Sequence, residues 1–179
     1  MIAILLADGF EEIEALTPLD ILRRAGLDAK TVAIGSKIAI GSHKIPVICD
    51  TLASELDPNE VSMLILPGGM PGSLNLDASQ ITDKLISAVI RNGGRIAAIC
   101  AAPLILGRRG LLDGKEATCY PGFENELKGA KTSEKPVVTD GNITTAKGMG
   151  VALEFALELV RITLGEKTAN EIADSVMKA

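Results

Sequence analysis

One cysteine occupies a position from which it could act as a nucleophile. Cys100 directly follows residues 95–99, Arg-Ile-Ala-Ala-Ile, which predict a strand. It precedes three small residues that begin a predicted helix, Ala101-Ala102-Pro103. A tight strand-to-helix turn of this kind, a nucleophile elbow, presents one side chain above the sheet. Unpaired N–H groups at a helix start favour the thiolate, so we expect a lowered pKa for Cys100. A buried, inert cysteine is the structural alternative.

An acidic group near the N-terminus supplies a partner for this thiol. Glu11 and Glu12 are explained by the favourable effect of negative charge at a helix N-terminus. Glu14 lies about one helical turn further along. If its carboxyl reaches Cys100, both groups cannot comfortably be anionic, so one of them keeps a proton. A protonated Glu14 beside a thiolate could serve as general acid and base.

Two glycine-rich loops could bring backbone N–H groups close to an anion. The first, Pro67-Gly68-Gly69-Met70-Pro71-Gly72-Ser73, follows a predicted strand, and the second, Gly148-Met149-Gly150, precedes a predicted helix. Plain tight turns are the structural alternative for both. Neither loop has the GxGxxG or GK[ST] pattern, so a nucleotide binder is poorly supported and no cofactor is expected.

The remaining polar candidates are less informative. His43 is the only histidine and lies in a predicted excursion, so a surface position is expected. A Cys–His dyad would have to recruit it from another place or another subunit. Tyr120 could reach the site with its hydroxyl, and the neighbouring Cys119 is interpreted as a buried residue. Three scattered cysteines and one histidine lack paired ligand spacing, so no metal site is predicted.

Alternating apolar and amphipathic segments indicate how these residues are positioned. Strands are predicted at 2–7, 31–34, 61–66, 95–99, 136–139 and 143–146, with a small antiparallel excursion at 37–49. Helices are predicted from residue 13 to about 22, with a second start or kink at Thr17-Pro18, and at 81–90, 101–109, 151–164 and 168–177. This pattern predicts a three-layer α/β sandwich with a mostly parallel sheet. Sites in such sheets lie at the carboxyl ends of the strands.

Composition limits the classes of function. The 179 residues, with 47% hydrophobic and 23% charged residues, suit one globular domain over 1–179. A net charge of −5 and only 2% aromatic residues argue against nucleic-acid binding. No run approaches the ~18 apolar residues of a membrane span. Three cysteines without a CxxC pair and a start unlike a secretory signal favour the reducing cytoplasm.

Taken in order, the motifs resemble the ThiJ/PfpI superfamily, specifically its parkinsonism-associated deglycase branch. The resemblance runs nearly end to end. It is carried by residues 7–14 (ADGFEEIE), 18–20 (PLD), 23–26 (RRAG), 66–69 (LPGG), 97–103 (AAICAAP) and 154–156 (EFA).

The resemblance implies a flavodoxin-like fold and a homodimer. It implies that Cys100 is an oxidisable nucleophile, that Glu14 is its hydrogen-bonded carboxylic partner, and that the N–H groups of Gly69 and Ala101 form an oxyanion hole. It also places Arg24 near the dimer interface, close to the site. The expected substrate is a small reactive dicarbonyl or an early glycation adduct.

Two departures and one alternative accompany this expectation. Ala101 stands where the protease-like branch has a histidine, which argues against a cysteine peptidase. Tyr120 replaces the histidine that several closer members carry before the proline at 121. The alternative is a sensor of oxidative stress, or a chaperone-like protein, that acts through oxidation of Cys100.

Overall fold

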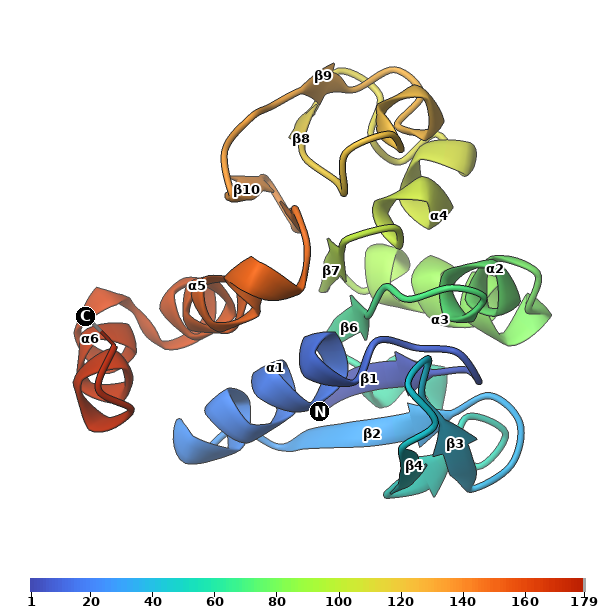
Figure 1. Ribbon diagram of the computed structural model, residues 1–179, viewed down its shortest axis with the longest axis horizontal. Helices are drawn as coiled ribbons and strands as arrows, with labels where there is room; N and C mark the ends of the chain where they lie inside the picture. The colour runs from blue at the N-terminus through green and yellow to red at the C-terminus, as the bar shows by residue number, and fades with distance from the viewer. Residues whose placement is uncertain (179) are drawn as a thin grey trace.

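A seven-stranded sheet runs through the centre of the molecule, which a computed structural model describes over residues 1–178 (Figure 1). Its strands are β1 (Ile2–Leu6), β2 (Ala29–Ala33), β5 (Thr51–Leu52), β6 (Met63–Leu66), β7 (Arg95–Ile99), β10 (Val137–Asp140) and β11 (Ile143–Ala146). They lie in the order β10-β11-β7-β6-β1-β2-β5. All neighbours are parallel except β10 and β11. The series β2-β1-β6-β7-β11 has the 2-1-3-4-5 order of the flavodoxin-like fold, which confirms the expected fold class.

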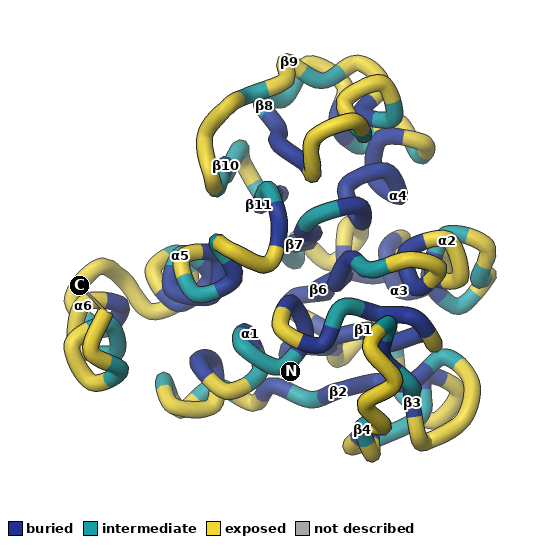
Figure 2. The backbone as a smooth tube through the Cα atoms, in the orientation of Figure 1, coloured by how far each residue is buried: buried dark blue, intermediate teal, exposed yellow. Residues whose placement is uncertain are grey.

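Helices cover both faces of the sheet. One face packs against α1 (Glu12–Arg24) and α5 (Ala152–Leu164), with α6 (Glu166–Ser175) lying on α5. The opposite face packs against α2 (Gly72–Asp77), α3 (Gln80–Arg91) and α4 (Pro103–Arg108). The two hydrophobic clusters that result make the sheet the middle layer of three, as Figure 2 shows by the buried colour of its central strands.

The apolar strands are buried on both faces. In β1, Ile4 and Leu6 join the cluster under α1 and α5, whereas Ala3 and Leu5 join the cluster under α3 and α4. All four side chains are fully buried. Alternation of side chains along a strand therefore explains why a continuous apolar run, rather than an alternating one, marks this strand in the sequence.

Smaller elements lie outside the main sheet. The hairpin of β3 (Ile38–Ile40) and β4 (Pro46–Ile48) is the predicted antiparallel excursion. A short parallel pair, β8 (Glu116–Ala117) and β9 (Lys131–Thr132), lies beside the β10–β11 edge of the main sheet, which β8 contacts (Figure 1). Three 3-10 turns complete the chain: η1 (Pro58–Glu60), η2 (Glu124–Glu126) and η3 (Met149–Val151). Among residues 1–178, no helix combines the length and apolar character needed to cross a bilayer.

Three local expectations need correction. Helix α1 continues through Pro18 without a second start, although proline removes one helical N–H. Helix α2 begins inside the loop 67–73, which the sequence predicts only as a turn. Helix α4 begins at Pro103 rather than at Ala101, so two turn residues separate Cys100 from the helix.

Packing at the buried faces predicts where substitution is most damaging. Phe155 of α5 is fully buried in the cluster that α1 shares. We expect Phe155→Ala to lower the free energy of unfolding by about 3–5 kcal/mol, because it removes apolar contacts and leaves a cavity. Urea unfolding monitored by circular dichroism measures this effect. Leu164→Ala, at the exposed end of the same helix, is the control with a change of about 1 kcal/mol or less. Equal losses in the two variants would contradict this packing.

Candidate active site

Cys100 stands at the carboxyl end of β7 in a strained backbone conformation. Its φ of 65° is in the left-handed region, which residues other than glycine rarely adopt. Two hydrogen bonds hold it there: its N–H donates to the carbonyl of Ala146 at 2.9 Å, and its carbonyl accepts from the N–H of Tyr120 at 2.8 Å. Strain of this kind concentrates at functional sites. The structure thus has the nucleophile-elbow geometry that the sequence predicts.

The Glu14 carboxyl lies beside this thiol. Glu14 is in the first turns of α1 and is only 1% exposed. Its Oε2 accepts a hydrogen bond from the N–H of Gly68 at 2.9 Å, and its carboxyl interacts with the Cys100 thiol. Its other oxygen, Oε1, makes no regular hydrogen bond within the described residues. The predicted pair is therefore assembled from segments far apart in the sequence.

A glycine that the sequence reasoning did not single out makes this contact possible. A Cβ atom on Gly68 would lie 2.5 Å from Glu14 Oε2 and 2.6 Å from Cys100 Cβ. Any side chain there would separate the carboxyl from the cysteine. The Pro67-Gly68-Gly69 motif is the only signal in the sequence, and it does not distinguish the two glycines.

Burial raises the pKa values of both the Glu14 carboxyl and the Cys100 thiol. Burial raises the pKa of Glu14 to about 7. Burial, followed by the charge of the nearby Glu14 carboxylate, raises the pKa of Cys100 to about 12. The expectation of a lowered thiol pKa is therefore wrong while Glu14 is ionised. The pair retains one proton above neutral pH, because two adjacent buried anions repel each other.

Two backbone N–H groups lower the pKa of the Cys100 thiol, as the sequence analysis expects of such groups. Hydrogen bonds from the N–H groups of Ala101 and Gly69 favour the Cys100 thiolate, although burial outweighs them. Gly69 has a φ of 87°, and a Cβ atom there would clash with the backbone of Gly9 and Glu11, so no other residue fits. The structure thus brings the N–H groups of both residues to the Cys100 sulfur, and their role as oxyanion donors stays a prediction.

Tyr120 and Gly148 border the same site. Tyr120, 51% exposed, is anchored by its N–H to the Cys100 carbonyl. Gly148 lies near the Tyr120 ring, the Cys100 sulfur and the Glu14 carboxyl. Both candidates are therefore placed next to the pair, whereas their roles remain proposals.

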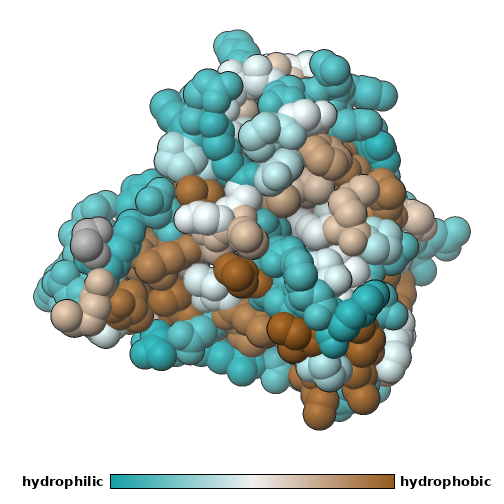
Figure 3. Space-filling view, in the orientation of Figure 1, coloured by the Kyte–Doolittle hydropathy of each residue, from teal (hydrophilic) through white to brown (hydrophobic). Residues whose placement is uncertain are grey.

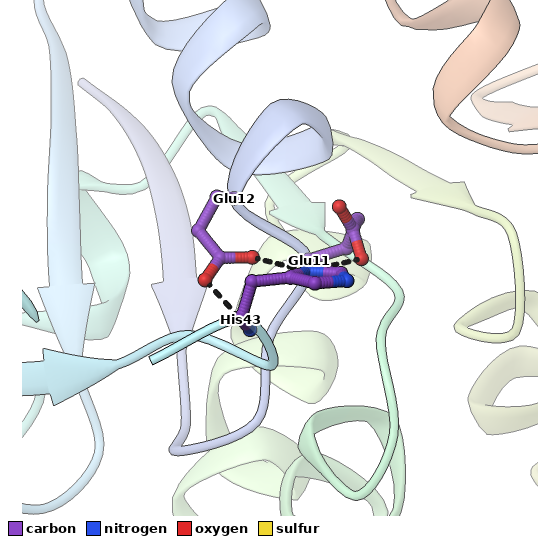
Figure 4. Close-up of side chains that lie close together, drawn as sticks. All are labelled: Glu11, Glu12 and His43. Atoms are coloured by element: carbon purple, nitrogen blue, oxygen red, sulfur yellow. Dashed lines mark hydrogen bonds and ion pairs between the residues drawn. The ribbon is translucent and has the colours of Figure 1, made fainter. Parts of the chain in front are cut away.

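His43 does not contact Cys100 but joins a separate polar cluster (Figure 4). Its side chain is 70% exposed, as expected for a surface histidine. Its main-chain N–H donates to Glu12 Oε1 at 2.9 Å, and its Nδ1 lies 3.2 Å from Glu12 Oε2. Burial raises the pKa of Glu12, but hydrogen bonds from its own N–H and from His43 outweigh it and lower the pKa below its ordinary value.

The same cluster is the one place in the described chain where three such side chains could hold a metal ion. The ligand atoms of Glu11, Glu12 and His43 lie within 4.8 Å of one another. The Ser42 hydroxyl donates to Glu11 and Glu12, so the carboxylates already have hydrogen-bond partners. The absence of a metal site, which the sequence predicts, stays a prediction.

Arg24 lies at the other end of α1. Its guanidinium donates to Asp20 at 2.7 Å, and in the described residues it makes no hydrogen bond with Cys100 or Glu14. It lines a groove of about 810 Å³ that also includes Ile13 and Ile45. The expectation that it lies close to the site is therefore not met within one chain.

Comparison with known proteins supplies the family. Residues 1–162 match the family model described as DJ-1/PfpI. The chain belongs to the DJ-1/PfpI family. The sequence resemblance is thereby confirmed, and so is the fold class, since solved structures of the DJ-1 superfamily superpose closely.

Three similar proteins illustrate the range of the DJ-1/PfpI family. Protein DJ-1 homolog B of Arabidopsis thaliana is 37% identical over 93% of the chain, but the chain spans only 39% of that relative's length. A deglycase of Pyrococcus abyssi is 31% identical over 90% of the chain and 98% of its own length. The crystal structure of a cysteine-to-alanine mutant of a DJ-1 superfamily protein from Salmonella typhimurium has a TM-score of 0.93 and 34% identity, covering 99% and 98% of the two chains.

The raised pKa of Glu14 predicts a pH-dependent contribution to stability. The folded state binds this proton more tightly than the unfolded chain, whose carboxyl has the ordinary value of 4.5. The stabilisation is therefore complete below that value and is lost as the pH rises through about 7. We expect the free energy of unfolding of wild type, relative to Glu14→Gln, to fall by about 3 kcal/mol between pH 4 and 8.

Chemical denaturation of wild type and Glu14→Gln across this pH range measures the difference between their free energies of unfolding. The other carboxylates titrate in both proteins, so their contributions cancel in this difference. Glu171→Gln, at an exposed position of α6, is the matched control and should show no such trend. A difference between wild type and Glu14→Gln that does not change with pH would contradict the raised pKa.

Proposed function

We propose that this DJ-1/PfpI family member is a cysteine-dependent enzyme of the glyoxalase or deglycase type, acting on small dicarbonyls or early glycation adducts. The observation that supports it best is the buried Glu14 carboxyl, which titrates near neutral pH against the Cys100 thiol. General acid–base catalysis is most effective when the pKa of the catalytic group lies near the working pH. A thiol and such a carboxyl together can both attack a carbonyl and move protons.

The first step is addition of sulfur to an aldehyde. Glu14 takes the thiol proton while Cys100 Sγ forms a bond to the aldehyde carbon, and the carbonyl electron pair moves to oxygen. The N–H groups of Gly69 and Ala101, which face the sulfur, would stabilise the developing oxyanion. Return of the proton from Glu14 to this oxygen yields a neutral hemithioacetal.

The second step moves hydrogen between neighbouring carbons. Glu14 removes the proton from the former aldehyde carbon, and the electron pair left behind forms a double bond to the keto carbon as the keto carbonyl electrons move to oxygen. Glu14 then returns this proton to the keto carbon, while the hydroxyl proton of the first carbon passes to the keto oxygen and a thioester carbonyl forms at the first carbon. The first carbon is oxidised and the second reduced, so no external oxidant or cofactor is required. The resulting thioester of a 2-hydroxy acid is hydrolysed by water, which releases the acid and restores the thiol.

Two features of the chain disfavour a cysteine peptidase. Ala101 follows the cysteine where the protease-like branch has histidine, and the only histidine, His43, lies in the polar cluster with Glu12. No general base of the Cys–His type is therefore supplied by this chain. The resemblance to a protein named a deglycase supports carbonyl chemistry instead.

A second candidate function is sensing of oxidative stress. Cys100 is half-buried rather than sealed, and Glu14 can keep a proton next to it. Two equivalents of peroxide would each transfer one oxygen to sulfur and release water, giving a sulfinate that a protonated Glu14 could hydrogen-bond. A reducing compartment such as the cytoplasm would keep the thiol available for either function.

Kinetics of single variants test the enzymatic proposal. Cys100→Ala should abolish conversion of methylglyoxal to lactate, because the attacking atom is removed. Glu14→Gln should remain folded and slow turnover by roughly 10²–10⁴-fold, the usual size of a general acid–base contribution. Cys49→Ala, which removes a buried thiol of the hairpin, is the matched control and should retain kcat.

Full activity in Cys100→Ala, or unchanged kinetics in Glu14→Gln, would remove that residue from the mechanism. Intact-mass measurement after mild peroxide separates the alternative. Addition of two oxygens at Cys100 in a wild-type protein that does not turn over dicarbonyls would favour sensing over catalysis.

We also propose that the partner of this chain is a second copy of itself. Apolar side chains gather on the face that carries α1 and the β3–β4 hairpin, as Figure 3 shows. Ile13, Ile45 and Met177 are exposed there and line the groove along α1, and Ile48 of β4 is exposed as well. Exposed apolar groups clustered in this way are typical of an interface. Arg24 at the end of this groove would then lie at the interface.

Oligomeric state tests the dimer. Light scattering coupled to gel filtration should give about twice the chain mass of 18.7 kDa for wild type. Ile13→Asp should yield the monomer mass, because burial of a charge in an apolar interface is unfavourable. Ile90→Asp, an exposed apolar position on α3 in the opposite layer, should stay dimeric. A wild-type monomer, or equal behaviour of both variants, would contradict the proposal.

A further inference from the structure

Gly148 leaves an atom-sized space directly over the reacting pair. A Cβ atom on this residue would lie 3.9 Å from Cys100 Sγ, 3.9 Å from Glu14 Oε1 and 3.3 Å from Tyr120 Cδ2. The first two separations are ordinary van der Waals contacts between non-bonded atoms. The third is slightly tight, so the Tyr120 ring closes the far side of the space.

The backbone at this position does not require glycine. Gly148 has φ 165° and ψ −173°, an extended conformation that any residue adopts. Gly68 differs, because a Cβ there would come within 2.6 Å of both Glu14 and Cys100. Gly68 is therefore needed for the site to assemble, whereas a side chain at 148 would only fill space above an assembled site.

The reaction proposed for Cys100 and Glu14 indicates which part of a substrate would occupy the space beside Gly148. A substrate bonded to Sγ through its aldehyde carbon carries its next carbon one bond away, and Glu14 must reach the hydrogens of both carbons. An atom at the Gly148 Cβ position would touch both the sulfur and the carboxyl, so it would compete for space with a substituent on carbons held between these two groups. The wall opposite, Tyr120, is exposed and joined to Cys100 only through its backbone, so its ring can yield to a larger group at some cost.

We propose that the absent side chain of Gly148, with the Tyr120 ring opposite, sets the size of the substituent beside the reacting carbonyl and thereby selects short 2-oxoaldehydes of two or three carbons. This inference rests on the proposed function and specifies its substrate class. Gly148 and Tyr120 determine specificity, whereas Cys100 and Glu14 perform the chemistry.

Gly148→Ala tests the proposal, with Gly150→Ala as a matched control. Both are single-methyl additions in one loop, and a Cβ at Gly150 would meet nothing within 4 Å. With glyoxal and methylglyoxal as substrates, Gly148→Ala should lower kcat/KM for methylglyoxal about 10–200-fold more than for glyoxal, the usual range for one methyl group in a pocket. Gly150→Ala should leave both values unchanged. A loss in Gly148→Ala that is equal for the two substrates would overturn the proposal.

A second measurement separates this inference from the proposed function. Alkylation of Cys100 by iodoacetamide and by the bulkier N-ethylmaleimide, followed by intact mass, needs no turnover. Gly148→Ala should reduce the rate ratio of the bulky to the small reagent at least tenfold, and Tyr120→Ala should raise it. An unchanged ratio in Gly148→Ala with a wild-type melting temperature would overturn the steric role. A shifted ratio of alkylation rates in a protein that does not turn over dicarbonyls would refute the enzyme function. The steric role of Gly148 would then stand, but the proposed substrate class would have no support.

Discussion

The contact between a buried carboxyl and a cysteine sulfur is the interaction on which the rest of this site depends. Removing Glu14 from water makes its charge costly, so its proton is held until near neutral pH. The same burial and the same charge hold the proton on Cys100 when Glu14 is ionised. One proton shared between two adjacent groups is the condition for moving protons during a reaction, and it exists because burial removes most of the water around Glu14 and part of the water around Cys100.

Close backbone approach maintains that contact. Gly68 has no side chain, so its N–H can donate to Glu14 while the space that a Cβ atom would need is taken by Glu14 and Cys100. The left-handed conformation of Cys100 is held by hydrogen bonds with Ala146, the last residue of β11, and with Tyr120. Because several chain segments meet at one residue, the geometry of the thiol depends on the whole carboxyl edge of the sheet rather than on its own turn.

Much of the architecture could be predicted, because strands buried on both faces leave continuous apolar runs. The strands at 95–99 and 143–146 have the predicted bounds. The rule that sites lie at carboxyl ends directed attention to the segments that contain Cys100 and Glu14, whereas Gly69 and Ala101 were named as oxyanion donors only by the family resemblance. The two-residue strands β5, β8 and β9 are too short to show periodicity. Helix α2, six residues long, was hidden by the glycine and proline residues before it. Pro18 suggested a break, but packing of α1 against α5 keeps the helix continuous.

The sequence by itself determined the three-layer fold class and pointed to Cys100 and Glu14 as the candidate pair, since these follow from residue type and from local periodicity. Only the tertiary structure decided the protonation of the pair, the difference between Gly68 and Gly148, and the separation of Arg24 and His43 from the thiol. Those properties depend on burial and on distances between segments far apart in the sequence, such as the 54 residues between Glu14 and Gly68. Local patterns contain no measure of such distances, because only the folded sheet brings these segments into contact.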